Sequence, residues 1–314
     1  MLKDLFERIS YNLITCLLLF LGYISSRLGI TERIQTGYFI GDLMRFFSRK
    51  RELITLENIE KAFPDESQSW HNSLCKNSYR NLGIVLMEIL CFKHLSYDDF
   101  KKYVHYENLE LLYDNYRKGK GLLLMSGHYG NWEYLAYTAG LFSKIPVTIV
   151  VNPLKNYIAD SFINKSRTMS GNKVVSMFDA ARTLINTINE GNAIAMLADQ
   201  SATEDKDVFI EIFGRTAAAY KAPAALALKF NIPIIMGFAE RQVDGTYKVH
   251  LSQLSYDDLK FDKDGIFVLT QRYTKALEDA VRRHPDHWLW QHRRWKHAPK
   301  YENSKLEEKP PNPL

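Results

Sequence analysis

Apolar and polar positions change their spacing along the chain near Gly119. Before that residue, apolar side chains recur mainly at helical intervals, as in the stretch 72–92. After it, short apolar runs alternate with amphipathic segments that are long enough for helices. Alternating strands and helices form a largely parallel sheet whose functional groups gather at the carboxyl ends of the strands. The pattern therefore predicts an α/β fold, with a mixed, largely parallel sheet flanked by helices.

The individual elements follow from this pattern and from the residues that interrupt it. Strands are expected at 121–126, 146–151, 193–198, 208–213, 233–239 and 247–251, and helices at 131–142, 154–168, 179–190, 217–230 and 266–283. The run Val243-Asp-Gly-Thr246 predicts a hairpin turn between the last two strands. The predicted organisation is an N-terminal segment (1–30), a helical region (31–118), an α/β domain (119–300) and a polar, proline-rich tail (301–314) that we expect to be disordered.

The N-terminal segment has an uncharged stretch, residues 9–26, between Arg8 and Arg27. A helix of that length is about 27 Å long, just short of the ~30 Å hydrocarbon core of a bilayer. Three interpretations are open: a tilted membrane span, an anchor lying in the membrane plane, and a buried core helix. Basic flanks favour a membrane-anchoring helix, and the basic residues that follow it predict that the bulk of the chain lies on the cytoplasmic side of the membrane. Because Asp4 and Glu7 precede the stretch and no cleavage site follows it, a cleaved signal peptide is not expected.

Composition narrows the class of protein only a little. Hydrophobic residues make up 46% of the 314 positions and charged residues 25%, which suits a sizeable core and excludes global disorder. A net charge of +5 favours acidic partners such as anionic lipids, phosphorylated substrates or an acidic carrier protein. The three cysteines fit neither a CxxC nor a zinc spacing, so we expect reduced thiols in a reducing compartment.

The candidate chemistry lies where the first predicted strand ends, in Ser126-Gly-His-Tyr-Gly-Asn-Trp-Glu133. If His128 lies in a loop and a helix begins near Asn131, Glu133 falls in the first helical turn and can reach back to the ring. A carboxylate bound to one ring nitrogen would fix the tautomer and leave the other nitrogen as a general base. The alternative is that His128 caps a turn and Glu133 is only a first-turn charge.

Other catalytic signatures are missing from the sequence. It contains no HExxH motif, and His-x4-Glu is not a usual zinc spacing, so no metal is expected. It also contains no nucleophile elbow, P-loop or dinucleotide fingerprint.

Several motifs in order resemble those of one enzyme family. The stretch 126–133 resembles the His-x4-Asp/Glu signature of glycerolipid-type acyltransferases, and more narrowly the lauroyl/myristoyl acyltransferases of bacterial lipid A biosynthesis. The other motifs that carry the resemblance are Asn58-Ile-Glu-Lys-Ala-Phe-Pro64, Asn152-Pro153, Arg167, Asp199-Gln200, Phe213-Gly-Arg215 and Trp288-Leu-Trp-Gln-His-Arg-Arg-Trp-Lys296.

The resemblance implies a membrane-bound enzyme with a glycerolipid-acyltransferase-like fold. It would transfer a fatty acyl chain from an acyl carrier protein or coenzyme A thioester to a hydroxyl of a lipid A precursor, with no resident cofactor. His128 and Glu133 would be catalytic, His128 taking the hydroxyl proton and Glu133 supporting the imidazolium. The residues that would bind substrate are Asn131, Arg167, Asp199, Arg293 and Arg294. The implied partners are the acyl carrier protein and a lipid acceptor in the membrane.

Alternatives remain for the role of the stretch 288–296, for the lipid acceptor and for the class of protein. The aromatic and basic stretch 288–296 can stack on nucleic-acid bases, lie at a membrane interface, or pack on the core with its arginines toward phosphate. The resemblance favours the last two, so no nucleic acid partner is expected. The acceptor can also be an aminolipid, a lysophospholipid or a glycolipid. A non-catalytic membrane- or nucleic-acid-binding protein is the third possibility, and in it His128→Ala would leave function intact.

Overall fold

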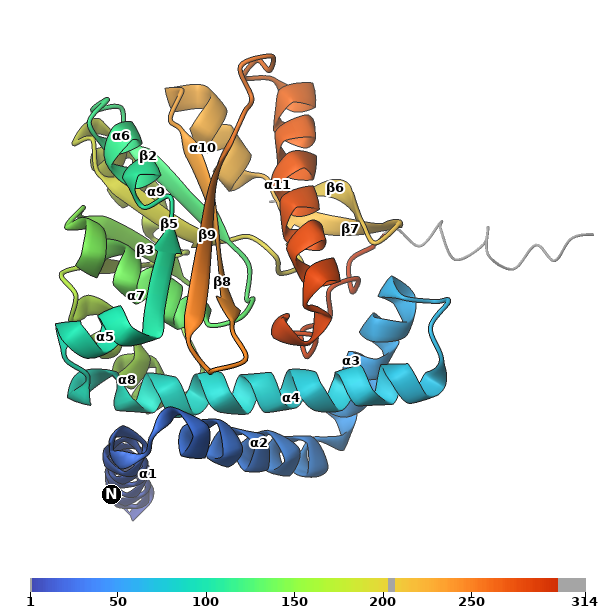
Figure 1. The fold of residues 1–314 in the computed structure, drawn as a ribbon. Coiled ribbons are helices and arrows are strands. Elements are labelled where there is room, and N and C mark those ends of the chain that lie inside the picture. The colour runs from blue at the N-terminus through green and yellow to red at the C-terminus, as the bar shows by residue number, and fades with distance from the viewer. Residues whose placement is uncertain (1, 203–206, 299–314) are drawn as a thin grey trace, which may run out of the picture.

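The computed structural model describes residues 2–202 and 207–298, with the side chains of all of these except residues 2–12, 14 and 207. The tail at 301–314, which we expect to be disordered, lies outside the described residues. Within them the chain forms a mixed sheet with helices on both faces, as the sequence predicts (Figure 1).

The helices and strands occur in the following order. The helices are α1 (Leu2–Arg27), α2 (Ile30–Phe47), α3 (Arg49–Ala62), α4 (Gln68–Cys91), α5 (Tyr97–Tyr103), α6 (Glu110–Tyr116), α7 (Trp132–Ser143), α8 (Tyr157–Thr168), α9 (Ala180–Asn189), α10 (Ala222–Phe230) and α11 (Lys263–Arg283). The strands are β1 (Val104–Glu107), β2 (Leu122–Ser126), β3 (Val147–Val151), β4 (Lys173–Ser176), β5 (Ala193–Leu197), β6 (Asp207–Ile212), β7 (Arg215–Tyr220), β8 (Ile234–Arg241) and β9 (Tyr247–Leu254).

The main sheet has the strand order β1-β9-β8-β2-β5-β3-β4. Pairing is parallel from β8 through β2, β5 and β3 to β4, and antiparallel only between β8 and β9. Strand β1 pairs in parallel with β9 and so forms one edge of the sheet. The region 31–118 is therefore not purely helical, because it supplies an edge strand to the α/β domain.

Strand β2 shows how the sheet is buried on both faces. Leu123 and Met125 belong to the same buried cluster as residues of α9, α10 and α11. Leu122 lies on the opposite face, in a second cluster with Phe100 of α5 and Tyr134 of α7. Successive side chains of a strand point to opposite faces, so a nearly continuous apolar run is what a two-sided core requires. This burial fixes the register that brings the strand ends together.

The N-terminal helices stack on α4, on the side away from the sheet (Figure 1). The contact between α2 and α4 depends on small residues. A Cβ on Gly83 of α4 would collide with the backbone of Gly37 and Gly41 in α2, and a Cβ on Gly41 would collide with the backbone of Tyr79 and Arg80. These glycines therefore let the backbones of the two helices come into direct contact.

One predicted helix was wrong in its first part. Residues 217–230 were expected to be helical throughout, but Ala217, Ala218 and Ala219 lie in β7, which pairs with β6 in a separate two-stranded sheet. The turn between these strands is Phe213-Gly214, and both residues have positive φ (53° and 70°), as a two-residue hairpin turn requires. The alanines are fully buried, so packing space in the hairpin overrides their helical preference. Strand β4 was also absent from the prediction.

The N-terminal stretch forms helix α1, as its apolar character indicates. Across the described residues, however, no helix combines the length and apolarity needed to cross a membrane. Of the three interpretations of this stretch, the tilted membrane span is therefore not supported by the structure.

The glycine contact between α2 and α4 leads to a stability prediction. Gly→Ala inside a helix normally stabilises by roughly 1 kcal/mol, but at Gly83 the added methyl must displace the backbone of α2. We expect Gly83→Ala to lower the free energy of unfolding by about 1–3 kcal/mol, the usual cost of overpacking. Chemical denaturation measures this, with Gln35→Ala on the exposed face of α2 as the control. A Gly83→Ala protein as stable as the wild type would contradict the close helix contact.

Candidate active site

Two neighbouring parallel strands bring the candidate residues together at one edge of the sheet. Strand β2 ends at Ser126, two residues before His128, and β5 ends at Leu197, two residues before Asp199. Ser126 and Leu197 are directly paired. The two loops therefore leave the sheet side by side, at the carboxyl edge where an α/β fold places its functional groups.

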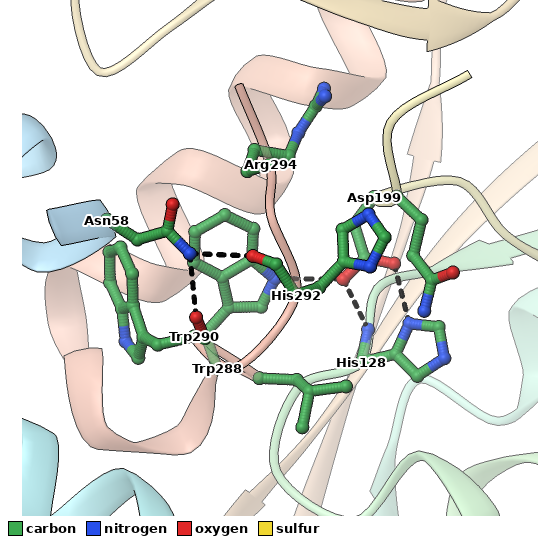
Figure 2. A pocket seen from close by; sticks show the side chains of 9 residues that line it. Asn58, His128, Asp199, Trp288, Trp290, His292 and Arg294 are labelled. Carbon is green, nitrogen blue, oxygen red and sulfur yellow. Dashed lines mark hydrogen bonds and ion pairs between the residues drawn. The ribbon is translucent and has the colours of Figure 1, made fainter. Parts of the chain in front are cut away.

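Asp199 is the carboxylate that binds His128. Its Oδ1 accepts a hydrogen bond from His128 Nδ1 at 2.8 Å, and its Oδ2 accepts from the His128 backbone N–H and from Trp288 Nε1, both at 2.8 Å (Figure 2). Asp199 is only 5% exposed. Burial by itself would raise the pKa of Asp199, but its electrostatic interaction with His128 and the donated hydrogen bonds outweigh burial and hold the pKa well below its usual range.

An ionised Asp199 fixes the tautomer of His128. Because a carboxylate only accepts, Nδ1 must carry the ring proton, and Nε2 is left with its lone pair free. Within the described chain Nε2 has no hydrogen-bond partner. His128 also lines a small pocket together with Asn58, Asp199, Gln200, Trp288, Leu289, Trp290, His292 and Arg294 (Figure 2). The ring is thus poised to take a proton from a group that enters this pocket.

The loop that carries His128 is held tightly by its neighbours. Gly130 has φ +57° and lies directly against the Ala239 carbonyl, so a side chain at this position would clash. Asn131 caps α7 by accepting from the Tyr134 backbone N–H at 2.8 Å, and its amide group donates to Glu88 at 2.7 Å. Asn131 was expected to bind substrate, but it is fully buried with both ends of its amide engaged. Its observed contacts position the loop and the start of α7.

Glu133, the carboxylate partner expected for His128, does not contact the His128 ring. Glu133 does lie in the first turn of α7, as expected, but its side chain points to α8 and forms a two-point ion pair with Arg167 (Nε–Oε2 2.8 Å, Nη2–Oε1 2.5 Å). The physical reason is charge: a 3% exposed carboxylate needs a cation, and Arg167 supplies one in fork geometry. Glu133 reaches His128 only indirectly, because Trp132 donates to Glu133 at 3.1 Å and packs edge-on against the His128 ring.

The two arginines of the 288–296 stretch have different environments. Arg293 is exposed, whereas Arg294 is 2% exposed and donates from Nη1 to the Ala218 carbonyl at 2.7 Å. Burial lowers the pKa of Arg294 to about 10, against the opposing influence of Asp199 and Tyr273. The side chain of Arg294 therefore belongs to the wall of the pocket rather than to an open phosphate-binding surface.

The segment 288–292 closes the site from the side of the N-terminal helices. Its Leu289 backbone N–H donates to the His128 carbonyl at 3.0 Å. Asn58 of α3 donates to the carbonyls of Trp290 and His292 at 2.7 and 2.6 Å. The Asn-x-Glu-Lys-Ala-Phe-Pro motif near the start of the chain and the Trp-rich motif near its end thus meet at one pocket. Asn58, Trp288 and His292 are not among the site residues predicted from the sequence, because the two motifs lie more than 200 positions apart and no local pattern brings them together.

Among residues 2–202 and 207–298, no group of three or more His, Cys, Asp or Glu side chains is arranged so that it could hold a metal ion.

Comparison with known proteins shows the family of the chain. Residues 4–297 match the family of bacterial lipid A biosynthesis acyltransferases, and the chain belongs to that family. It is 22% identical over 270 residues to the lipid A biosynthesis palmitoleoyltransferase of Escherichia coli K12, with 85% of this chain and 86% of the relative covered. It is 20% identical over 263 residues to the lauroyltransferase of the same strain, with 84% and 85% covered. A lipid A biosynthesis acyltransferase of Shigella flexneri matches at 22%. The protein is therefore an acyltransferase.

Proposed function

We propose that this enzyme transfers a fatty acyl chain from a thioester to a hydroxyl of a lipid A precursor, with His128 as the general base. The observation that carries the proposal is the His128–Asp199 hydrogen bond, which leaves Nε2 free in a pocket. The family supports the reaction class and the acceptor. The donor is an acyl carrier protein thioester, with the coenzyme A thioester as the alternative.

The reaction would proceed without an acyl-enzyme. Nε2 of His128 takes the proton of the acceptor hydroxyl as its oxygen attacks the thioester carbon. The positive imidazolium that forms is stabilised by the buried negative charge of Asp199, which is 2.8 Å from Nδ1. When the tetrahedral intermediate collapses, the carbon–sulfur bond breaks and the leaving thiolate takes the proton back from His128. The products are the ester and the free thiol, and His128 returns to its starting state.

The Glu133–Arg167 pair has a positioning role in this scheme. It connects α7 to α8, and through the Trp132 indole it holds the aromatic ring against which His128 packs. The role expected for Glu133, direct support of the imidazolium, passes to Asp199.

The base assignment predicts a specific pattern of activity loss. We expect His128→Ala and Asp199→Asn each to lower kcat for acyl transfer by about 10²–10⁴, the usual contribution of a positioned base. In Asp199→Asn a neutral amide replaces the carboxylate, so the negative charge that stabilises the imidazolium is lost. Purified enzyme with acyl carrier protein thioesters and a panel of lipid acceptors, read by mass spectrometry, measures this and identifies the acceptor.

The control for these variants is His105→Ala, an exposed histidine of β1, which should keep full activity. Transfer at the wild-type rate by folded His128→Ala would remove His128 from the mechanism. A wild-type enzyme that acylates another lipid but no lipid A precursor would refute the proposed acceptor.

A lipid acceptor requires access to a membrane surface, and α1 and α2 offer a suitable one. Phe46 and Phe47 at the end of α2 are 78% and 75% exposed, and the large apolar side chains Leu13, Leu17, Phe20, Phe39 and Leu43 on the two helices are exposed as well. Arg45, Arg49, Lys50 and Arg51 adjoin the two phenylalanines in the sequence. Apolar side chains bordered by basic ones suit an anionic lipid surface. We infer that these helices lie on the cytosolic face of the inner membrane.

This inference predicts weaker membrane binding when the phenylalanines are removed. Because each buried Phe stabilises association by about 1.5–3 kcal/mol, Phe46→Ser/Phe47→Ser should reduce partitioning into anionic phospholipid vesicles at least tenfold. The matched control is Phe261→Ser, in the linker that leads into α11 at the opposite end of the molecule (Figure 1). Equal sedimentation of both variants with vesicles would reject α2 as the binding surface.

A further inference from the structure

A second histidine lies in the pocket beside His128. His292 belongs to the 288–292 segment, and its carbonyl is held by Asn58 at 2.6 Å. Its ring lines the same pocket as His128 and Asp199, and one ring nitrogen is on the side facing these two residues (Figure 2). The mechanism proposed above has not used this ring.

The position of the proton on His292 follows from its hydrogen bond to the main chain. The Ser201 backbone N–H donates to Nε2 of His292 at 3.2 Å, so Nε2 acts as the acceptor. In the neutral ring the proton must then be on Nδ1, which makes Nδ1 a donor. Across the described residues, Nδ1–H has no hydrogen-bond acceptor.

The surroundings keep the ring neutral. Burial lowers the pKa of His292 to about 4, and Lys296, His128 and Arg294 add to this effect while Asp199 opposes it. A neutral donor places no second positive charge beside His128, which must itself become positive during the reaction. A neutral imidazole can still stabilise a developing oxyanion by hydrogen bonding.

We infer that His292 is a catalytic residue whose Nδ1–H donates a hydrogen bond to the thioester carbonyl oxygen as that oxygen becomes negative. The inference rests on the proposed acyl transfer and assigns one donor of its oxyanion hole.

The step involves no proton transfer to or from His292. As the acceptor oxygen bonds to the thioester carbon, the carbonyl π pair moves onto oxygen, and Nδ1–H stabilises that charge. When the pair returns, the carbon–sulfur bond breaks and the thiolate receives the proton held by His128. His292 ends the cycle in its original tautomer. A donor of this kind typically contributes about 10²–10³ in kcat, because the charge exists mainly in the transition state.

Two isosteric variants separate this role from a structural one. The side-chain amide of Asn overlays the Nδ1 position of His, and that of Gln overlays Nε2. His292→Asn therefore keeps a donor in the pocket and loses the contact with Ser201, whereas His292→Gln keeps that contact and loses the donor. We expect His292→Asn to stay within about tenfold of wild-type kcat and His292→Gln to lose about 10²–10³, with KM little changed in both.

The other outcomes overturn the inference. If His292 only anchors Ser201, the order is reversed and His292→Gln is the active variant. Equal activities of the two variants, high or low, also contradict a donor at Nδ1. Melting temperatures are recorded for both. If His292→Gln fails to fold, Nδ1-methylhistidine at position 292 takes its place, because this residue keeps the ring and the Ser201 contact and carries a methyl group instead of the Nδ1 hydrogen. If His292→Asn fails to fold, the wild type is compared with the Nδ1-methyl variant, and equal activities of these two overturn the inference.

The wild-type protein and His128→Ala are measured in the same assay. A wild type that transfers no acyl group refutes the proposed function itself. A wild type that transfers, together with the wrong order of the His292 variants, refutes only the role of His292.

Discussion

The hydrogen bond between the buried Asp199 carboxylate and His128 Nδ1 is the interaction on which the site depends. A buried carboxylate is costly unless its oxygens are satisfied, and here the donors are the ring of His128, its backbone N–H and the Trp288 indole. Each donor belongs to a segment that the fold must position next to Asp199. The pairing of β2 with β5 aligns the two strand ends, and Gly127 leaves no room for a side chain between Leu277 and Asp199.

The Trp288 donor connects this interaction to the rest of the chain. Asn58 from α3 binds the segment 288–292, and Asn81 from α4 donates to the carbonyl of His287, the residue just before this segment, at 3.2 Å. The helices beneath the sheet therefore hold in place the segment that shapes the pocket. The same group of helices exposes the apolar surface that we propose for the membrane. The surface proposed for lipid contact, on α1 and α2, and the segment that shapes the pocket of His128 therefore both pack against α4 (Figure 1).

The sequence predicted most of the α/β domain because strands buried on both faces leave an unmistakable apolar run, as at 121–126. It missed β7, where buried alanines resemble a helix, and it missed β1, whose pairing with β9 is not local. It selected His128 correctly as a residue of the strand-end loop. It chose Glu133 as the partner because sequence proximity was the available measure. The partner is Asp199, 71 positions away, and only the adjacency of β2 and β5 brings it near. The buried ion pair of Glu133 with Arg167 depends on how α8 packs, which no local pattern encodes.

Nitrogen-15 NMR of labelled histidine observes directly which carboxylate holds His128. At a pH where the ring is neutral, we expect His128 to be protonated at Nδ1 and unprotonated at Nε2. In Asp199→Asn this tautomer preference should weaken, and in Glu133→Gln it should persist. Protonation of His128 at Nε2 in the wild type would contradict the pairing of His128 with Asp199. A tautomer preference that is lost in Glu133→Gln but kept in Asp199→Asn would contradict it as well.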